Sequence, residues 1–189
     1  MAESSKILRA LDGILHPLGF VRRGATWNRV STPWVDVINV QVDKFGQDFA
    51  INLGVADPGI YERCWRRPLP DWVAESQCTV RARLSVLATG LDRWWGLVDA
   101  AALTDVSDLL ATHGLAFLQS MHSPERMADF LGGRVRGLIA SEFVCLVLLL
   151  DRVGRRREAC DTIRDHGGRI VGPWAANIAE LAAALNCEH

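Results

Sequence analysis

Several targeting and membrane signals are missing from this 189-residue chain. The N-terminus, Met1 to Lys6, lacks the basic stretch followed by an apolar stretch that makes a signal peptide. The longest apolar run, from Leu138 to Leu150, is shorter than the roughly 20 residues that a bilayer-spanning helix needs. The sequence therefore predicts a cytoplasmic protein with no membrane segment.

The common catalytic and metal-binding motifs are missing as well. The 16 glycines form no dinucleotide-binding or phosphate-loop pattern, and neither the zinc-protease nor the hydrolase motif occurs. The five cysteines show no Cys-x-x-Cys spacing, which argues against a zinc module and against a disulfide framework. We expect no metal and no cofactor, and we expect free, buried or half-buried thiols at positions 64, 78, 145, 160 and 187.

An excess of charge of either sign is also absent. The chain has 21 basic and 22 acidic residues, and Lys6 and Lys44 are the only lysines. A net charge of -1 disfavours binding to nucleic acid, which requires a strongly basic surface. The 49% of hydrophobic residues are enough for the chain to bury its own core.

The first half of the chain has the alternating patterns of an antiparallel sheet. Apolar residues from Ile7 to Leu18 fall on one stripe and predict a helix that begins after Ser4 or Ser5. A hairpin is expected over residues 20–30, with its turn at Gly24. Residues 34–44 and 48–55 alternate between apolar and polar side chains, which predicts two paired strands with one face on a core.

The middle of the chain is harder to interpret. Residues 56–76 contain three prolines among aromatic residues and predict a long ordered loop. Residues 78–86 alternate like a strand, but their Ala-Arg-Leu composition also suits a helix. The sequence leaves strand and helix open there.

From about Leu103 the pattern becomes helical. Helices are expected to start at Asp105 and after the Ser123-Pro124 cap, and three more are expected over 138–152, 155–166 and 173–185. His113 falls on the apolar stripe of its helix, where a core or boundary histidine is expected rather than a catalytic base. The whole pattern predicts an α+β fold, with a sheet domain over 1–100 and a helical extension over 101–189 packed on it, or one continuous domain.

Three sequence blocks carry a family resemblance. They are Leu15-His-Pro-Leu-Gly-Phe-Val-Arg-Arg-Gly-Ala-Thr-Trp-Asn-Arg29, Val37-Ile-Asn-Val-Gln41 and Phe49-Ala-Ile-Asn-Leu-Gly-Val55. With the later Val80-Arg-Ala-Arg-Leu84 and Trp94-Trp95, they resemble the bacterial family catalogued as domain of unknown function 4304. The resemblance covers roughly residues 5–97. It implies the same sheet, and it transfers no catalytic residues, cofactor or substrate.

Three amide side chains are the first candidate binding group. Asn39, Gln41 and Asn52 share the polar side of two adjacent predicted strands. Their donors and acceptors could face a peptide or a small ligand. The alternative is that they bond to a covering loop, perhaps 56–76, and satisfy one another.

Arginines and tryptophans form the second candidate group. Arg81 and Arg83 would project from one face of their strand, and Arg63, Arg66 and Arg67 precede them in the chain. They could clamp a carboxylate or phosphate, or they could form internal ion pairs. Trp94 and Trp95 are adjacent and cannot point the same way, so one of them is expected to be half exposed, either as an interface anchor or as a packing residue.

Two function classes remain open on the sequence. The first is a protein- or peptide-binding module, for example an immunity-like or regulatory partner, that uses the polar sheet face. The alternative is an enzyme or binding protein for an anionic small molecule held by the arginines. A flat sheet face with a partly exposed tryptophan side chain would favour the binding module. A deep pocket with converging arginines and a carboxylate would favour the enzyme or small-molecule-binding protein.

Overall fold

The computed structural model describes residues 2–187, with side chains from residue 5 onward. Its contacts divide this part of the chain into two compact units. The sheet unit comprises residues 2–57 and 70–120, and the helical unit comprises residues 58–69 and 121–187. Within residues 2–187, no helix is both long enough and apolar enough to cross a membrane.

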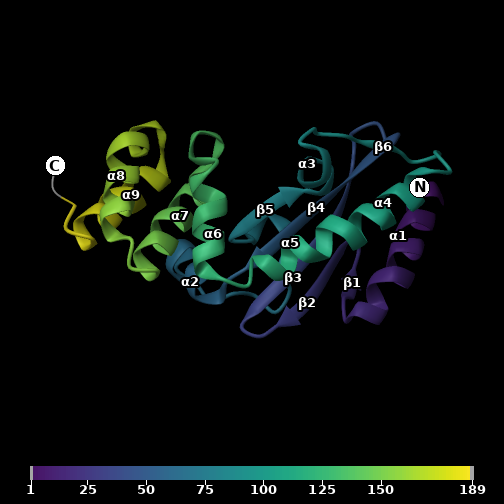
Figure 1. Cartoon of the computed structure of the whole chain (residues 1–189), viewed down its shortest axis with the longest axis horizontal. Coiled ribbons are helices and arrows are strands. Elements are labelled where there is room, and N and C mark those ends of the chain that lie inside the picture. Colours follow the sequence, from purple (N-terminus) through teal and green to yellow (C-terminus); the bar gives the residue numbers. More distant parts are fainter. Residues whose placement is uncertain (1, 188–189) are drawn as a thin grey trace. The chain divides into compact units, whose positions relative to one another are not determined.

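The sheet unit is built on six antiparallel strands joined mostly by hairpins (Figure 1). The order β1-β2-β3-β4-β5 follows the chain, and β6 pairs with the end of β4 that β5 leaves open. The strands are β1 (Val21–Arg23), β2 (Thr26–Ser31), β3 (Trp34–Val42), β4 (Asp48–Ala56), β5 (Val80–Arg83) and β6 (Trp95–Gly96). The predicted hairpin at Gly24 and the predicted pair of long strands are both confirmed.

Helices cover the apolar face of this sheet. They are α1 (Ala2–Leu15), α3 (Leu84–Thr89), α4 (Ala102–Leu109) and α5 (Leu115–Ser120). A short 3-10 turn, His16–Leu18, follows α1, and another, Glu75–Gln77, precedes β5. Trp27, Ile38 and Leu53 lie opposite one another on three neighbouring strands and are fully buried. The N-terminal helix begins at Ala2, earlier than the predicted start after Ser4 or Ser5.

A π-helical turn, Leu110–Gly114, joins α4 to α5 and explains why the expectation for His113 is wrong. The wider turn shifts the phase of the helix, so that Gly114 faces the core and His113 is exposed. A Cβ atom at Gly114 would lie 3.1–3.4 Å from side-chain atoms of Leu110, Leu84 and Leu53. The helix therefore comes closest to the sheet at this glycine.

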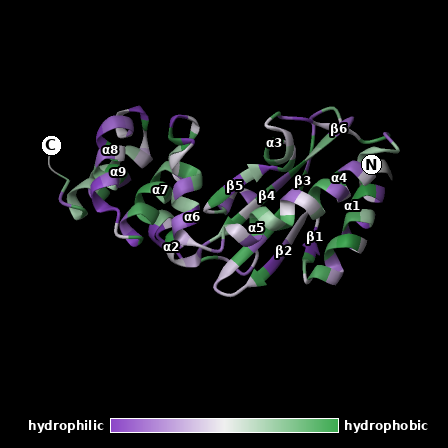
Figure 2. Ribbon diagram, viewed as in Figure 1, coloured by the Kyte–Doolittle hydropathy of each residue, from purple (hydrophilic) through white to green (hydrophobic). Residues whose placement is uncertain are grey.

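The helical unit contains five α-helices. They are α2 (Pro58–Trp65), α6 (Pro124–Gly132), α7 (Ala140–Arg152), α8 (Arg156–His166) and α9 (Pro173–Ala184), with 3-10 turns at Val135–Gly137 and Gly167–Arg169. The central α7 is nearly all apolar, whereas α8 is mostly hydrophilic (Figure 2). The predicted helix starts in this region are confirmed, and Ser123 caps α6 by accepting a 3.2 Å hydrogen bond from the backbone N–H of Arg126.

Two local predictions need correction. The expected loop over 56–76 is in part the helix α2, because Pro58 fits the first helical turn and Ile60, Tyr61 and Cys64 form a buried stripe. Residues 78–86 are strand and helix in succession, since β5 ends at Arg83 and α3 begins at Leu84. The overall architecture is α+β, with an N-terminal helix, an antiparallel sheet and a helical C-terminal half.

Candidate functional site

A row of polar side chains crosses the sheet on the face opposite the apolar core. The pairing register places these residues directly opposite one another on five consecutive strands, and opposed residues share a face. The row consists of Arg23, Thr26, Asn39, Asn52 and Arg83. We call these five residues the polar row.

Hydrogen bonds link the amides at the centre of the row. The Nδ2 atom of Asn39 donates to the Thr26 hydroxyl at 2.9 Å, and the Nδ2 atom of Asn52 lies 3.4 Å from the Asn39 Oδ1 atom. The Asn52 Nδ2 atom also donates to the Gln41 Oε1 atom at 3.1 Å, and Arg83 donates to that same oxygen at 3.3 Å. The three predicted amides are thus brought together and partly satisfy one another.

Each end of the polar row is a guanidinium over a half-buried tryptophan. Arg23 lies 4.6 Å from the ring centroid of Trp72, and Arg83 lies 4.8 Å from that of Trp94. Stacking of this kind favours a fixed orientation of the guanidinium. Two flat aromatic surfaces therefore bracket the amides.

The segment that follows α2 in the chain and contains Val73 and Cys78 covers the neighbouring part of the same face of the sheet. Asn28 exchanges two hydrogen bonds with the backbone of Val73, at 2.8 and 3.0 Å, and so acts like a strand neighbour for this segment. Gly54 leaves room for Cys78, whose sulfur would lie only 2.6 Å from a Cβ atom there. Burial raises the pKa of the Cys78 thiol well above its ordinary value, so this cysteine is not an activated nucleophile.

Both arginines of β5 already face carboxylates. Arg81 makes two hydrogen bonds to Glu75, at 2.7 and 3.2 Å, and Arg83 lies 3.1 Å from Asp92. Among the described residues, the buried Nη1 atom of Arg83 has no hydrogen-bond acceptor. The β5 guanidiniums are thus held largely by internal partners.

The other three candidate arginines belong to the helical unit. Arg63 pairs with Asp151 at 3.2 Å, and Arg66 bonds to Glu180 and Asn177. Arg67 donates to the Tyr61 hydroxyl at 3.1 Å. Each of the three is accounted for inside its own unit, so their contacts support the interpretation as internal pairs.

The adjacent tryptophans separate as the sequence predicts. Trp95 is fully buried, donates to Asp105 at 2.8 Å and packs 6.0 Å from the Phe49 ring. Trp94 is half buried under Arg83. Trp95 therefore belongs to the core, and only Trp94 remains a candidate for binding.

Sequence reasoning missed three residues of this surface. Arg23 and Thr26 flank the two-residue turn at Gly24, and the hairpin geometry alone would have placed them opposite each other. Trp72 gave no such signal, because nothing in a proline-rich segment shows where its side chain points. Tracing the pairing register across all strands, and not two alone, would have found the row.

The helical unit has a cavity of about 360 Å³ whose lining includes Asp129, Glu158, Asp165 and His166. Arg155 also lines it and bonds to Asp129 and Glu158, so these two carboxylates are already paired. Within residues 2–187, no group of three or more His, Cys, Asp or Glu side chains is placed to hold a metal ion.

The cysteine prediction is only half right. Cys64, Cys78 and Cys145 are buried free thiols, but Cys160 and Cys187 form a disulfide. Spacing in sequence could not show this, because helix packing brings the two residues together across 27 positions.

Comparison with known proteins gives one match. No curated protein and no solved structure matches this chain. One family profile, described as a domain of unknown function, matches residues 11–120, more than half of the chain and nearly all of the sheet unit. On this match, the chain belongs to the domain of unknown function family DUF4304.

Proposed function

We propose that this chain is a binding module that holds an extended segment of another polypeptide across the polar row. The observation that carries the proposal is the row itself, which places amide, hydroxyl and guanidinium groups on five consecutive strands. Arg23 at one end of the row and Gln41 beside its centre are exposed, whereas Asn52 at its centre is buried.

The chemistry of the row suits a peptide. Side-chain amides offer one acceptor and two donors each, the same groups that a peptide backbone presents. Four inter-strand spacings give the row a length of about 19 Å, which an extended segment of about six residues would span. Gln41 is exposed beside the centre of the row and extends this polar surface.

The two tryptophans supply the apolar part of the surface. Trp72 and Trp94 are each half buried, so each keeps part of its ring open beside an arginine. Half-buried tryptophan and arginine are the residues that most often carry binding energy in interfaces. A regulatory or immunity-like role would be one form of such binding, by analogy of fold only.

An anionic small molecule held by Arg81 and Arg83 has less support. Glu75 already occupies Arg81, and Asp92 and Gln41 already bond to Arg83. An anion would have to displace these partners before it could be bound bidentately.

The test compares two matched variants in the full chain. Gln41→Arg places a long cation beside Arg83 and obstructs the row, whereas Gln119→Arg makes the same change at an exposed position on α5. The tagged protein and both variants are purified gently from the host and weighed by native mass spectrometry. Melting curves show that each variant is folded.

The proposal expects a stoichiometric polypeptide on the parent chain and on Gln119→Arg, with retention reduced about tenfold or more on Gln41→Arg. Equal retention on both variants would place the partner elsewhere on the molecule. A small-molecule adduct in place of a polypeptide would favour the anionic ligand instead.

A further inference from the structure

The five cysteines fall into two classes with different access to solvent. Cys64, Cys78 and Cys145 are buried thiols inside the two units. Cys160 and Cys187, which form the disulfide, are both half exposed. A dissolved thiol could therefore reach this bond but not the three free cysteines.

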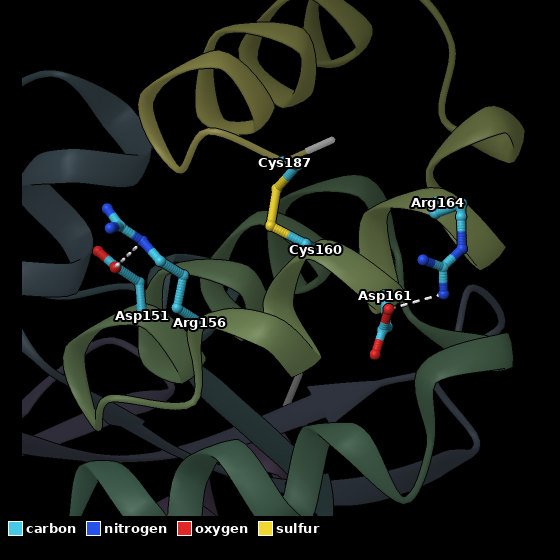
Figure 3. The surroundings of a disulfide bond; sticks show 6 residues. All are labelled: Asp151, Arg156, Cys160, Asp161, Arg164 and Cys187. Carbon is cyan, nitrogen blue, oxygen red and sulfur yellow. Dashed lines mark hydrogen bonds and ion pairs between the residues drawn. A yellow bond between two sulfur atoms is a disulfide. The ribbon is translucent and has the colours of Figure 1, made fainter. Parts of the chain in front are cut away.

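The disulfide ties the end of α9 to α8 (Figure 3). Cys160 lies in the middle of α8, and Cys187 follows the last turn of α9. Because the bond closes a loop of 27 residues, breaking it would return considerable conformational freedom to that loop.

The other contacts of α9 lie mostly at the surface of the helical unit. Arg66 bonds to Asn177 and Glu180 of this helix. Ile178 is the only buried residue within α9, Leu185 just beyond it is also buried, and a space of about 290 Å³ is lined by residues of both α7 and α9. The disulfide therefore adds a covalent restraint to a helix with little buried surface.

Arginines flank the sulfur of α8. Arg156 and Arg164 stand four residues before and after Cys160, so the three side chains share one stripe of the helix, and Figure 3 shows the two arginines on either side of the disulfide. Their side chains are 56% and 60% exposed. Arg164 is held by two carboxylates, Asp161 at 2.7 Å and Asp165 at 3.1 Å, whereas the ion pair of Arg156 with Asp151 is long, at 4.0 Å. Arg156 is therefore the more available cation, and a nearby guanidinium stabilises a thiolate.

We propose that the Cys160–Cys187 disulfide is a reversible exchange site for a small anionic thiol of the glutathione class, and that opening it releases α9. The thiolate attacks the sulfur of Cys187, and the electron pair of the broken S–S bond goes to Cys160, where Arg156 stabilises the thiolate until it takes a proton. A second small thiol then attacks the mixed disulfide and expels the Cys187 thiolate, which takes a proton. The protein disulfide is reduced to two thiols, and two small thiols are oxidised to one disulfide.

Release of α9 would change the surface of the helical unit. The ring of Trp65 in α2 packs edge-on against Trp174 of α9, with centroids 5.3 Å apart. Without α9, Trp65 and the α7 side chains Val144 and Leu148 would lose this cover. The exchange reaction would thus uncover an apolar patch under redox control.

The first experiment uses the unmodified chain. The protein is equilibrated in glutathione buffers of graded ratio, alkylated and mapped by mass spectrometry, while hydrogen exchange is followed in α9 and in β4 as an internal control. We expect the Cys160–Cys187 bond to open at the reducing end of the series. Amides of α9 should then exchange at least about tenfold faster, with those of β4 unchanged.

The second experiment tests Arg156. Arg156→Gln should slow opening by glutathione about fivefold, because the departing Cys160 thiolate loses its nearby cation. Opening by the uncharged thiol 2-mercaptoethanol should also slow, but by a smaller factor, since that thiol has no carboxylate for Arg156 to attract. Arg164→Gln is the matched control: it makes the same change on the other side of Cys160, at an arginine already held by Asp161 and Asp165, and should leave both rates unchanged.

Three results would overturn the proposal. The bond could remain intact in the most reducing glutathione buffer, which would make it a permanent staple. It could open without faster exchange in α9, which would show that the helix is held by its other contacts. An opening rate of Arg156→Gln equal to that of the parent would remove the role of Arg156.

Discussion

The two faces of the sheet are built from the same strands, yet one face is apolar and the other is polar. Neighbouring residues on one strand lie on opposite faces. Trp27, Ile38 and Leu53 on one face are fully buried under helices. Thr26 and Asn39, each one residue away from a member of that set, belong to the polar row. Because side chains alternate along a strand, a register slip of one residue would exchange the faces.

The two faces also differ in how their polar atoms find hydrogen-bond partners. On the apolar face, polar groups are paired at buried positions: the fully buried Trp27 donates to Asp12 at 2.9 Å, and the fully buried Asp36 accepts from Arg29 at 2.9 Å and from Ser31 at 3.0 Å. On the polar face, Gln41 accepts from both Asn52 and Arg83. One face therefore gains stability from burial, and the other keeps a shared network at the surface.

The largest expected effect on the free energy of unfolding comes from substituting the adjacent tryptophans. Trp95→Ala should lower the free energy of unfolding by about 3–5 kcal/mol, because it empties a buried site and leaves Asp105 without its indole donor. Trp94→Ala should cost about 1 kcal/mol or less, since its ring is half exposed. Urea unfolding of both variants measures the gap. Equal losses would mean that the two faces are not energetically distinct.

Much of the sheet unit could be predicted from sequence because its signals are local. Alternation in residues 48–55 assigns each side chain of β4 to a face, and the two-residue turn at Gly24 sets the register of β1 and β2. Asn39, Gln41 and Asn52 were grouped correctly for this reason. The prediction that they serve as a binding site is untested.

The missed features depend on contacts that local patterns do not encode. The π turn at Leu110–Gly114 places Gly114 close to Leu53 and Leu84, and neither residue is near it in sequence. The hydrogen bonds from Asn28 to Val73 and the disulfide from Cys160 to Cys187 join segments 45 and 27 residues apart. Only the folded chain brings these groups together.

A smaller effect is expected on the polar face. Arg81→Ala combined with Arg83→Ala should lower the free energy of unfolding by about 2 kcal/mol, because Glu75 loses a bidentate partner in a mostly buried position. The Arg83–Asp92 pair should add little, since the Asp92 side chain is 57% exposed. Thermal and urea unfolding would measure the change.

Arg9→Ala is the matched control, because this exposed arginine bonds to the Ser5 carbonyl oxygen within its own helix α1. A melting temperature unchanged in the double variant would contradict the assignment of Arg81 and Arg83 to internal pairs. They would then be free to serve a ligand, and the anionic small molecule would regain support.

The smallest effect concerns the hairpin that fixes the register of both faces. The Asp43 carboxylate accepts from the backbone N–H groups of Gln47 at 2.7 Å, Asp48 at 3.1 Å and Phe45 at 3.2 Å. These N–H groups, that of Asp48 above all, hold the pKa of the Asp43 carboxyl below its usual value.

Since the pKa is depressed in the folded state, the carboxylate stabilises the hairpin at pH values above the unfolded pKa. This contribution is lost as the pH falls through the folded pKa. A side-chain NMR titration should place the midpoint of Asp43 below the usual range of an aspartate, and the amide of Gln47 should exchange faster on acidification. Asp43→Asn should remove the pH dependence at Gln47. If Asp43 instead titrates in the usual range, the carboxylate does not hold the turn, and the register that separates the two faces of β3 and β4 must rest on strand pairing alone.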